Sequence, residues 1–314
     1  MPVPAIIFPA DPLNPGRPDP HFAWEARLVR ESGGEHHLVD HDALLAGRAV
    51  EAVRRVPKDG GPLWYRGWMM PSRDYAAFAA ALSARGGNLL TSAAGYAAAH
   101  ELPGWYGVFE GSTPPSVWIP STGGAADSAT AAGPGREELA DAVARLGGRG
   151  PAIVKDYVKS RKHEWHEACY VPELADLDAV GRVVARFVEL QGEFLAGGVV
   201  LRRYEEFQRA SAPGRAGAVA GAGGSRPVEA RVWWLDGEPV LVGPHPDAPH
   251  AEVDPDLTGV RSLVRTLGCR FVTTDLASRA DGSGWRVVEV GDGQVSDLPH
   301  GIDATGLLTS LIAA

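Results

Sequence analysis

The chain has 314 residues, of which 45% are hydrophobic and 22% are charged, so it is long enough to bury a sizeable core in two domains. Its formal net charge of -9 excludes the overall positive charge of a general nucleic-acid-binding protein, and no run of about 20 apolar residues predicts a membrane helix. Because the N-terminus lacks the pattern of a signal peptide, we expect a cytoplasmic protein with neither a nucleic-acid nor a membrane partner.

The first half of the chain alternates short apolar runs with segments of helical periodicity. We expect strands at 5–8, 63–65 and 89–90, and helices at 21–31, 43–55, 72–85 and 92–100. Strands that alternate with helices are typical of a parallel α/β layer, which we assign to a first domain, residues 1–120. Residues 121–135 consist mainly of Ser, Thr, Gly, Ala and Pro, a composition that predicts a flexible linker.

The second half, 136–314, mixes strands and helices. We expect helices at 136–146, 177–195, 257–267 and 301–312, and strands at 152–155, 164–171, 198–204, 270–275 and 285–290. Strands 228–235 and 239–242 are joined by Asp236-Gly237, a strong hairpin signal. Residues 209–227 are rich in Gly and Ala and lack periodicity, which predicts a mobile loop.

The cysteine and histidine patterns do not favour a metal centre. Cys169 and Cys269 form no CxxC motif, so we expect two buried thiols. His163 and His166 lie in an expected strand, where a spacing of three places them on opposite faces. The other clustered histidines are expected in a surface loop: His36, His37 and His41.

Lysine is scarce, and its distribution is therefore informative. The chain has four lysines, and three of them, Lys155, Lys159 and Lys162, fall within eight residues after a predicted strand. A lysine ammonium is a compact point charge that often binds phosphate. The cluster predicts either a phosphate-binding segment or a solvated basic turn.

The last two predicted strands bring two carboxylates together. If their turn is centred on Gly282, Asp275 faces Glu289, and opposed like charges destabilise a sheet unless a cation or a shared proton lies between them. The pair therefore indicates Mg²⁺, a lysine or an arginine, with Asp292 as a further oxygen ligand, unless both carboxylates are simply exposed. A Walker A loop is excluded because the chain has no Gly-Lys dipeptide.

Taken in order, these motifs resemble the ATP-grasp superfamily. The order runs through 152–160 (AIVKDYVKS), 199–204 (VVLRRY), 229–232 (EARV), Thr274-Asp275 and 288–294 (VEVGDGQ). The resemblance implies an α/β and α+β fold, in which a Rossmann-like domain precedes a two-lobed ATP-grasp module. The lid lobe is expected at about 150–200 and the catalytic lobe at about 201–314.

The resemblance also implies a role for each matching residue. Lys155 is expected to contact the α- and β-phosphates of ATP, under a closing loop that contains Lys159, Ser160 and Lys162. Arg203 and Tyr204 are expected to form the hinge whose backbone binds adenine, with Glu205 or Glu206 near the ribose. A surface strand without a ligand is the alternative for the hinge segment.

For the catalytic lobe, the resemblance implies that Arg231 faces the γ-phosphate, unless it is paired structurally with Glu229 or another acid. Mg²⁺ is expected on Asp275, Glu289 and Asp292. Many members of the superfamily have Asn two residues after the metal-binding Glu, where this chain has Gly291. Asp292 is our expected replacement, and Gln294 is the second choice.

The implied reaction is an ADP-forming ligation in which ATP activates a substrate carboxylate as an acyl phosphate that an amine then captures. Small amino acids or peptides are the expected substrates. Arg66 is a candidate anchor for the substrate carboxylate, or else a structural cation stacked between Trp64 and Trp68. A kinase that phosphorylates a small molecule and a non-catalytic ATP-binding module are alternatives. A homodimer is the default assembly because closed dimers are the commonest oligomers.

Overall fold

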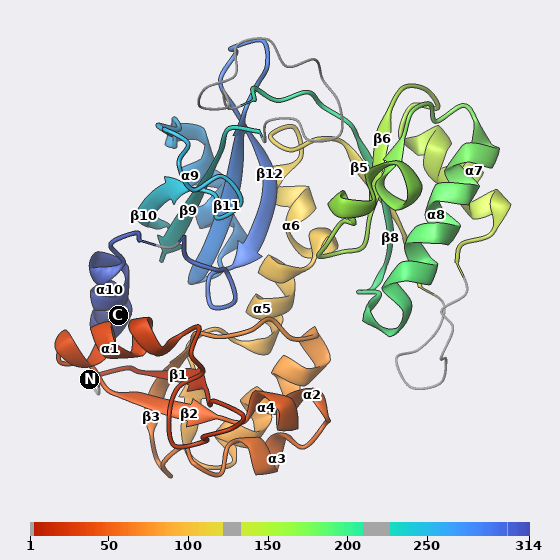
Figure 1. Cartoon of the computed structure of the whole chain (residues 1–314). Coiled ribbons are helices and arrows are strands. Elements are labelled where there is room, and N and C mark those ends of the chain that lie inside the picture. The colour runs from red at the N-terminus through yellow and green to blue at the C-terminus, as the bar shows by residue number, and fades with distance from the viewer. Residues whose placement is uncertain (1–2, 122–132, 210–226, 300) are drawn as a thin grey trace. The chain divides into compact units, whose positions relative to one another are not determined.

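The computed structural model describes residues 3–121, 133–209, 227–299 and 301–314, and the chain forms two compact units (Figure 1). The first unit comprises Met1–Ala99 and Phe207–Ala314, and the second comprises His100–Glu206. Most of the expected linker, 122–132, and of the expected mobile loop, 210–226, lies outside the described residues.

A parallel sheet with the strand order β2-β1-β3-β4 opens the first unit, as the alternating pattern predicts. Every residue of the central strand β1 is buried, because the strand is apolar throughout. The strands are β1 (Ala5–Pro9), β2 (His36–Val39), β3 (Gly61–Tyr65) and β4 (Gly87–Leu89), and the helices are α1 (Ala23–Glu31), α2 (His41–Leu45), α3 (Ala49–Ala52), α4 (Ser72–Ser83) and α5 (Ala93–His100).

Two expectations for this sheet are wrong. His36 and His37 do not lie in a loop but form the start of β2, whose register pairs His36 with Ile6 of β1. His41 is 9% exposed at the start of α2, and burial lowers its pKa. The single helix expected at 43–55 is divided into α2 and α3, because Gly47 between them has a φ of 73°.

An antiparallel sheet with the order β10-β9-β11-β12 completes the first unit. Its strands are β9 (Glu229–Leu235), β10 (Glu238–Pro244), β11 (Phe271–Ser278) and β12 (Trp285–Asp292), accompanied by α9 (Thr258–Leu267) and α10 (Thr305–Ala313). Asp236 and Gly237 have φ angles of 50° and 80°, which confirms the predicted hairpin.

One hydrophobic core connects the two sheets of the first unit. Ile6, Phe8 and Trp64 from the parallel sheet pack in one cluster with Trp233, Phe271 and residues of α10. Helix α10, at the violet end of the chain in Figure 1, also lies against α1. The shared core fixes the antiparallel strands against the first domain of the sequence, so a site on those strands has a rigid base.

The second unit is built on an antiparallel sheet with the order β5-β8-β6-β7. Its strands are β5 (Ser116–Pro120), β6 (Ala152–Lys155), β7 (Tyr170–Val171) and β8 (Gly198–Arg203), and its helices are α6 (Leu102–Phe109), α7 (Arg136–Arg145) and α8 (Leu177–Gln191). Strand β5 pairs with β8, so the second unit begins at His100 and not after the expected linker.

The strand expected at 164–171 is wrong. Only Tyr170–Val171 extends as β7, whereas Lys162–Glu164 and Trp165–Cys169 form a 3₁₀ turn and a π-helical turn. The turn buries Ala168 and Cys169 completely, so tertiary packing overrides the strand-like composition. His163 and His166 lie in these turns, and both are exposed. Across the described ranges, no helix combines the length and apolar character needed to cross a membrane.

Candidate functional site

Three charged side chains form a row across the strands β9, β11 and β12. The register pairs Asp275 with Arg231 on one side and with Glu289 on the other, and it confirms the predicted juxtaposition of the two carboxylates. Arg231 donates from Nε to Asp275 Oδ1 at 2.7 Å and from Nη2 to Oδ2 at 2.8 Å. Arginine is therefore the cation that the opposed carboxylates require.

Burial makes the interaction of Arg231 with Asp275 electrostatically strong. The two side chains are only 14% and 6% exposed. Burial alone would raise the pKa of Asp275, but the charge and hydrogen bonds of Arg231 outweigh it and hold that pKa well below its usual range. Burial alone would likewise lower the pKa of Arg231, but the charges of Asp275 and Glu289 outweigh it and raise that pKa. Both partners are therefore ionised at neutral pH.

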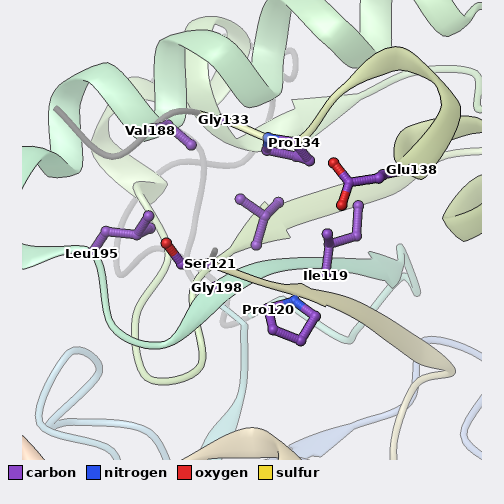
Figure 2. A pocket seen from close by; sticks show the side chains of 10 residues that line it. Ile119, Pro120, Ser121, Gly133, Pro134, Glu138, Val188, Leu195 and Gly198 are labelled. Carbon is purple, nitrogen blue, oxygen red and sulfur yellow. The ribbon is translucent and has the colours of Figure 1, made fainter. Parts of the chain in front are cut away.

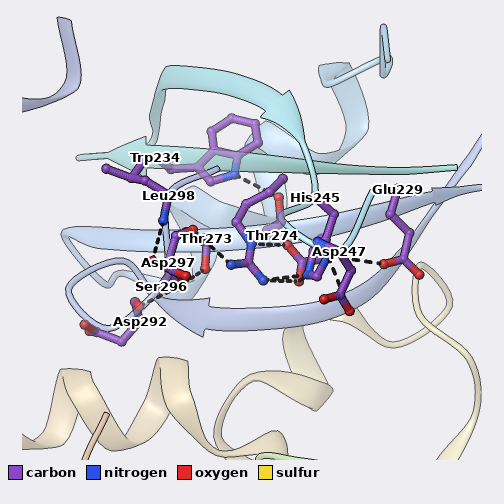
Figure 3. A network of polar contacts seen from close by, with 12 residues as sticks. Glu229, Trp234, His245, Asp247, Thr273, Thr274, Asp292, Ser296, Asp297 and Leu298 are labelled. Carbon is purple, nitrogen blue, oxygen red and sulfur yellow. Dashed lines mark hydrogen bonds and ion pairs between the residues drawn. The ribbon is translucent and has the colours of Figure 1, made fainter. Parts of the chain in front are cut away.

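His245 is a member of this site that the sequence analysis missed. Arg231 Nη2 donates to His245 Nε2 at 2.8 Å, and the same ring nitrogen lies 3.4 Å from Asp275 Oδ2 (Figure 3). His245 follows β10, and its backbone N–H donates to the Glu229 carbonyl. Continuing the hairpin register past the end of β10 would have placed His245 beside Arg231, because Gly243 pairs with Arg231.

The structure does not bring Asp292 into the row. Asp292 pairs with Val272, and because it is three residues beyond Glu289 it lies on the opposite face of the strand. Its Oδ1 accepts hydrogen bonds from the backbone N–H and the side-chain amide of Gln294, and its Oδ2 has no hydrogen-bond partner among the described residues. Burial raises the pKa of Asp292 to about 7. The expectation of a third oxygen ligand here is wrong.

Gln294 is equally unsuited to a metal. It is completely buried, and its side-chain oxygen accepts a hydrogen bond from the backbone N–H of Tyr65. Within the described parts of the chain, no group of three or more His, Cys, Asp or Glu residues is placed to hold a metal ion. Asp275 and Glu289 alone remain, which fits Mg²⁺ because that ion is commonly held by one or two carboxylates together with substrate phosphates.

Arg66 is a structural cation, which corrects its expected role as a substrate anchor. Its side chain is 0% exposed and forms a bidentate ion pair with Glu25, at 2.8 Å and 2.9 Å. Its third nitrogen donates to the carbonyl groups of Gly293, Gln294 and Ser296. Arg66 therefore ties the segment after β12 to the parallel sheet, and its guanidinium is buried away from any substrate.

In the second unit, Lys155 ends β6 and is 4% exposed, with Nζ 3.3 Å from the Val158 carbonyl. The turn after it is organised by Asp156, which the sequence analysis missed. Asp156 accepts hydrogen bonds from the backbone N–H groups of Val158 and Lys159 and from Gln191 Nε2. The buried carboxylate thus fixes the path of the chain from Lys155 to the next lysine.

The other residues of the expected loop follow this turn. Ser160 forms a bridge to Lys155, while Lys159 and Lys162 are exposed. Arg161 contacts Glu164 at 2.9 Å and the Leu190 carbonyl at 3.3 Å, so the segment is attached to the end of α8. The structure gathers Lys155, the turn and the two exposed lysines in one segment of the second unit.

The expected hinge is only partly available to a base. The backbone N–H of Arg203 donates to Pro115, and that of Tyr204 donates to Pro151, so neither is open to adenine. The Tyr204 ring contacts Trp165 and Tyr170, which stack at 5.1 Å, and this aromatic cluster was not expected. Glu205 is half-buried and Glu206 is exposed.

The cavities of the two units contain none of the predicted residues. A cavity of about 20 Å³, lined mostly by apolar groups such as Ile119, Val188 and Leu195, is shown in Figure 2 and has room for about one water. A hollow of about 840 Å³ lies along α3 and α4 and is lined by alanines and residues 47–54. Neither feature competes with the charged row as the candidate site.

Both cysteines are buried, as expected, and burial raises the pKa of each thiol to about 11. Neither thiol is therefore a reactive thiolate at neutral pH.

Residues 145–311, just over half of the chain, match a family of ATP-grasp domains, the third family of its clade. The fold is similar to that of a RimK domain ATP-grasp protein from Sphaerobacter thermophilus DSM 20745, with a TM-score of 0.56 and 16% identity over 99% of this chain and 100% of that one. It is also similar to the ATP-grasp ligase PsnB, solved with the precursor peptide PsnA2 and AMPPNP (TM-score 0.54, 14% identity, 98% and 96% of the two chains).

A third similar structure is the macrocyclase MdnC from Microcystis aeruginosa MRC, bound with the precursor peptide MdnA (TM-score 0.53, 10% identity, 99% of each chain). At these identities the similarity is one of fold. No curated protein matches the chain in sequence.

Proposed function

The chain belongs to this family of ATP-grasp domains, and on that premise we propose that it is an ADP-forming carboxylate-amine ligase. In this reaction a carboxylate oxygen attacks the γ-phosphorus of ATP, and ADP leaves. An amine then attacks the carbonyl carbon of the acyl phosphate and loses a proton, and inorganic phosphate leaves. The net result joins two substrates at the cost of one ATP.

The observation that carries the proposal is the charged row of Arg231, Asp275 and Glu289. Phosphoryl transfer demands charge stabilisation and alignment more than covalent chemistry from the protein. The guanidinium presents several donors in a plane, which suits a phosphoryl group. Because Arg231 lies over the shared core of the first unit, its position is defined before any ligand arrives, which is the condition for electrostatic preorganisation.

The carboxylates of the row are the residues to which we assign the metal. Asp275 and Glu289 are hard oxygen donors on neighbouring strands, and together with phosphate oxygens they complete an acceptable Mg²⁺ environment. Mg²⁺ bound with ATP supplies charge neutralisation of the phosphates. Asp292 has no part in this assignment.

The lysines of the second unit are assigned to the phosphates of ATP. Lys155 is buried at the end of β6 and presents a fixed ammonium, while Lys159 and Lys162 are exposed on the turn that Asp156 organises. We assign the adenine and ribose to residues 205–206, since the N–H groups of Arg203 and Tyr204 are already used. Glu206 is the exposed carboxylate suited to the ribose hydroxyls.

Amino acids or peptides are the substrate class that we propose. The support is the fold similarity to PsnB and MdnC, both of which were solved with precursor peptides. Since Arg66 is buried, the substrate carboxylate has to meet another cation, and Arg231 is the one in the row.

The test is a screen of amino-acid and peptide pairs with ATP and Mg²⁺, read by ADP release and by product mass. A ligase yields a product that contains both substrates less one water. A product that gains phosphate instead indicates a kinase, and ATP binding without turnover on any pair indicates a binding module. The Glu289→Gln variant should lose turnover. Arg270→Gln, which removes a surface arginine from the same sheet, should retain it.

A further inference from the structure

The row on the antiparallel sheet has a cation where the proposed metal is expected. Asp275 stands between Arg231 on β9 and Glu289 on β12, each directly opposite it in the strand register. Both oxygens of Asp275 accept hydrogen bonds from Arg231, at 2.7 Å and 2.8 Å. A metal ion that binds Asp275 must therefore displace at least one of these bonds.

The guanidinium is held in this place by more than Asp275. Arg231 Nη2 donates to His245 Nε2 at 2.8 Å, and Nη1 donates to the Asp297 carbonyl at 3.2 Å. The Trp233 ring lies below it, with its centroid 5.9 Å from Cζ. With a side chain only 14% exposed, Arg231 has a single well-packed position in the ligand-free chain.

We propose that Arg231 acts as an internal counter-ion that closes the Asp275-Glu289 pair to a free divalent cation, so that the metal enters only together with a triphosphate. This regulation of metal entry rests on the proposed function, because it concerns the same site.

The reason is the charge balance of the row. A free Mg²⁺ that reached Asp275 would stand beside the Arg231 guanidinium, and in a partly buried site the two positive charges repel strongly. The packing of Arg231 against His245 and Trp233 leaves it no other carboxylate in the row except Glu289, which the metal also needs. A triphosphate changes this balance, since its oxygens offer the guanidinium a new bidentate partner at the moment when the metal takes Asp275.

The direct test measures Mn²⁺ binding without nucleotide, by the loss of the free-ion electron paramagnetic resonance signal. We expect no saturable binding to the wild-type chain at millimolar Mn²⁺, and binding at least tenfold tighter in Arg231→Gln. The matched control is Arg270→Gln. Arg270 also forms a bidentate pair, with Asp236 at 2.8 Å for both bonds, but that pair lies at the hairpin turn, away from Glu289. Its loss should create no Mn²⁺ site.

A second measurement uses the wild-type chain and does not depend on the folding of a neutral variant. The Arg231 Nε–H is hydrogen-bonded and buried, so its ¹⁵N resonance is expected to be protected from exchange, and Arg231→Lys identifies it by its absence. Addition of MgCl₂ alone should leave the resonance unchanged. Addition of MgCl₂ with AMPPNP, a triphosphate that is not hydrolysed, should shift it.

Each outcome decides the proposal. It is overturned if the wild-type chain binds Mn²⁺ alone as tightly as Arg231→Gln does, if neither binds it, or if the Nε resonance moves with MgCl₂ alone. It is also overturned if AMPPNP binds and the resonance does not move. Absence of any AMPPNP binding, seen as an unchanged melting temperature, instead overturns the proposed function, whatever the Mn²⁺ comparison shows.

Discussion

The buried ion pair of Arg66 with Glu25 allows a quantitative prediction. Both side chains are at most 1% exposed, and Arg66 also donates to three carbonyl groups of the segment after β12. Truncation to alanine leaves the Glu25 carboxylate buried without a counter-ion and removes the donor that those carbonyls share. Removal of one partner of a buried pair costs about 3–5 kcal/mol. We expect Arg66→Ala to lower the free energy of unfolding by about 4 kcal/mol.

Urea unfolding followed by circular dichroism measures this loss. The control is Arg27→Ala on the same helix as Glu25. Arg27 is 63% exposed and 3.7 Å from Glu31, so its removal should change the stability by no more than about 0.5 kcal/mol. If Arg66→Ala is as stable as the Arg27 variant and instead raises the KM of a substrate, Arg66 is a ligand-binding residue and the structural argument is refuted.

Three further changes test other parts of the fold. Burial raises the pKa of Asp292 to about 7, so folding takes up a proton and stability falls as the pH rises from about 4 to about 7. Asp292→Asn should abolish this slope in urea midpoints, and an unchanged slope would contradict the assignment. Asp156→Ala should cost about 3 kcal/mol and speed amide exchange at Val158; native exchange rates would count against the turn. Gly237→Ala, at a φ of 80°, should cost about 1 kcal/mol or more in the same urea assay, and wild-type stability would disprove strain there.

Local patterns were sufficient to predict much of the fold. The apolar run of β1 and the Asp236-Gly237 turn each carry their signal within a few residues, and both were confirmed. The same local logic placed Asp275 opposite Glu289, because a short hairpin fixes the register of its strands. Segments whose structure depends on distant partners were missed. Strand β2 begins with two histidines and is defined by its pairing with β1, and β5 joins a sheet formed by much later residues.

The site was predictable in its residues but not in their partners. Arg231 and Asp275 are 44 positions apart in the chain, so no local spacing predicts that one neutralises the other. Arg66 lies beside two tryptophans in the sequence, but it is paired with Glu25 from another element. Asp292 is an acidic residue close to Glu289, and only the alternation of a strand that runs to its last residue separates their faces.

The measurement that tests the central claim most directly is the melting temperature with and without ATP and Mg²⁺, for the wild-type chain and the Lys155→Ala and Glu289→Ala variants. Lys58→Ala, which removes the exposed lysine outside the cluster, is the control. A ligand at 100 times its dissociation constant stabilises the folded chain by about 2.7 kcal/mol. We predict a clear upward shift for the wild-type and Lys58→Ala chains that both site variants lose. No shift in the wild-type chain, or equal shifts in all four proteins, would contradict the nucleotide site.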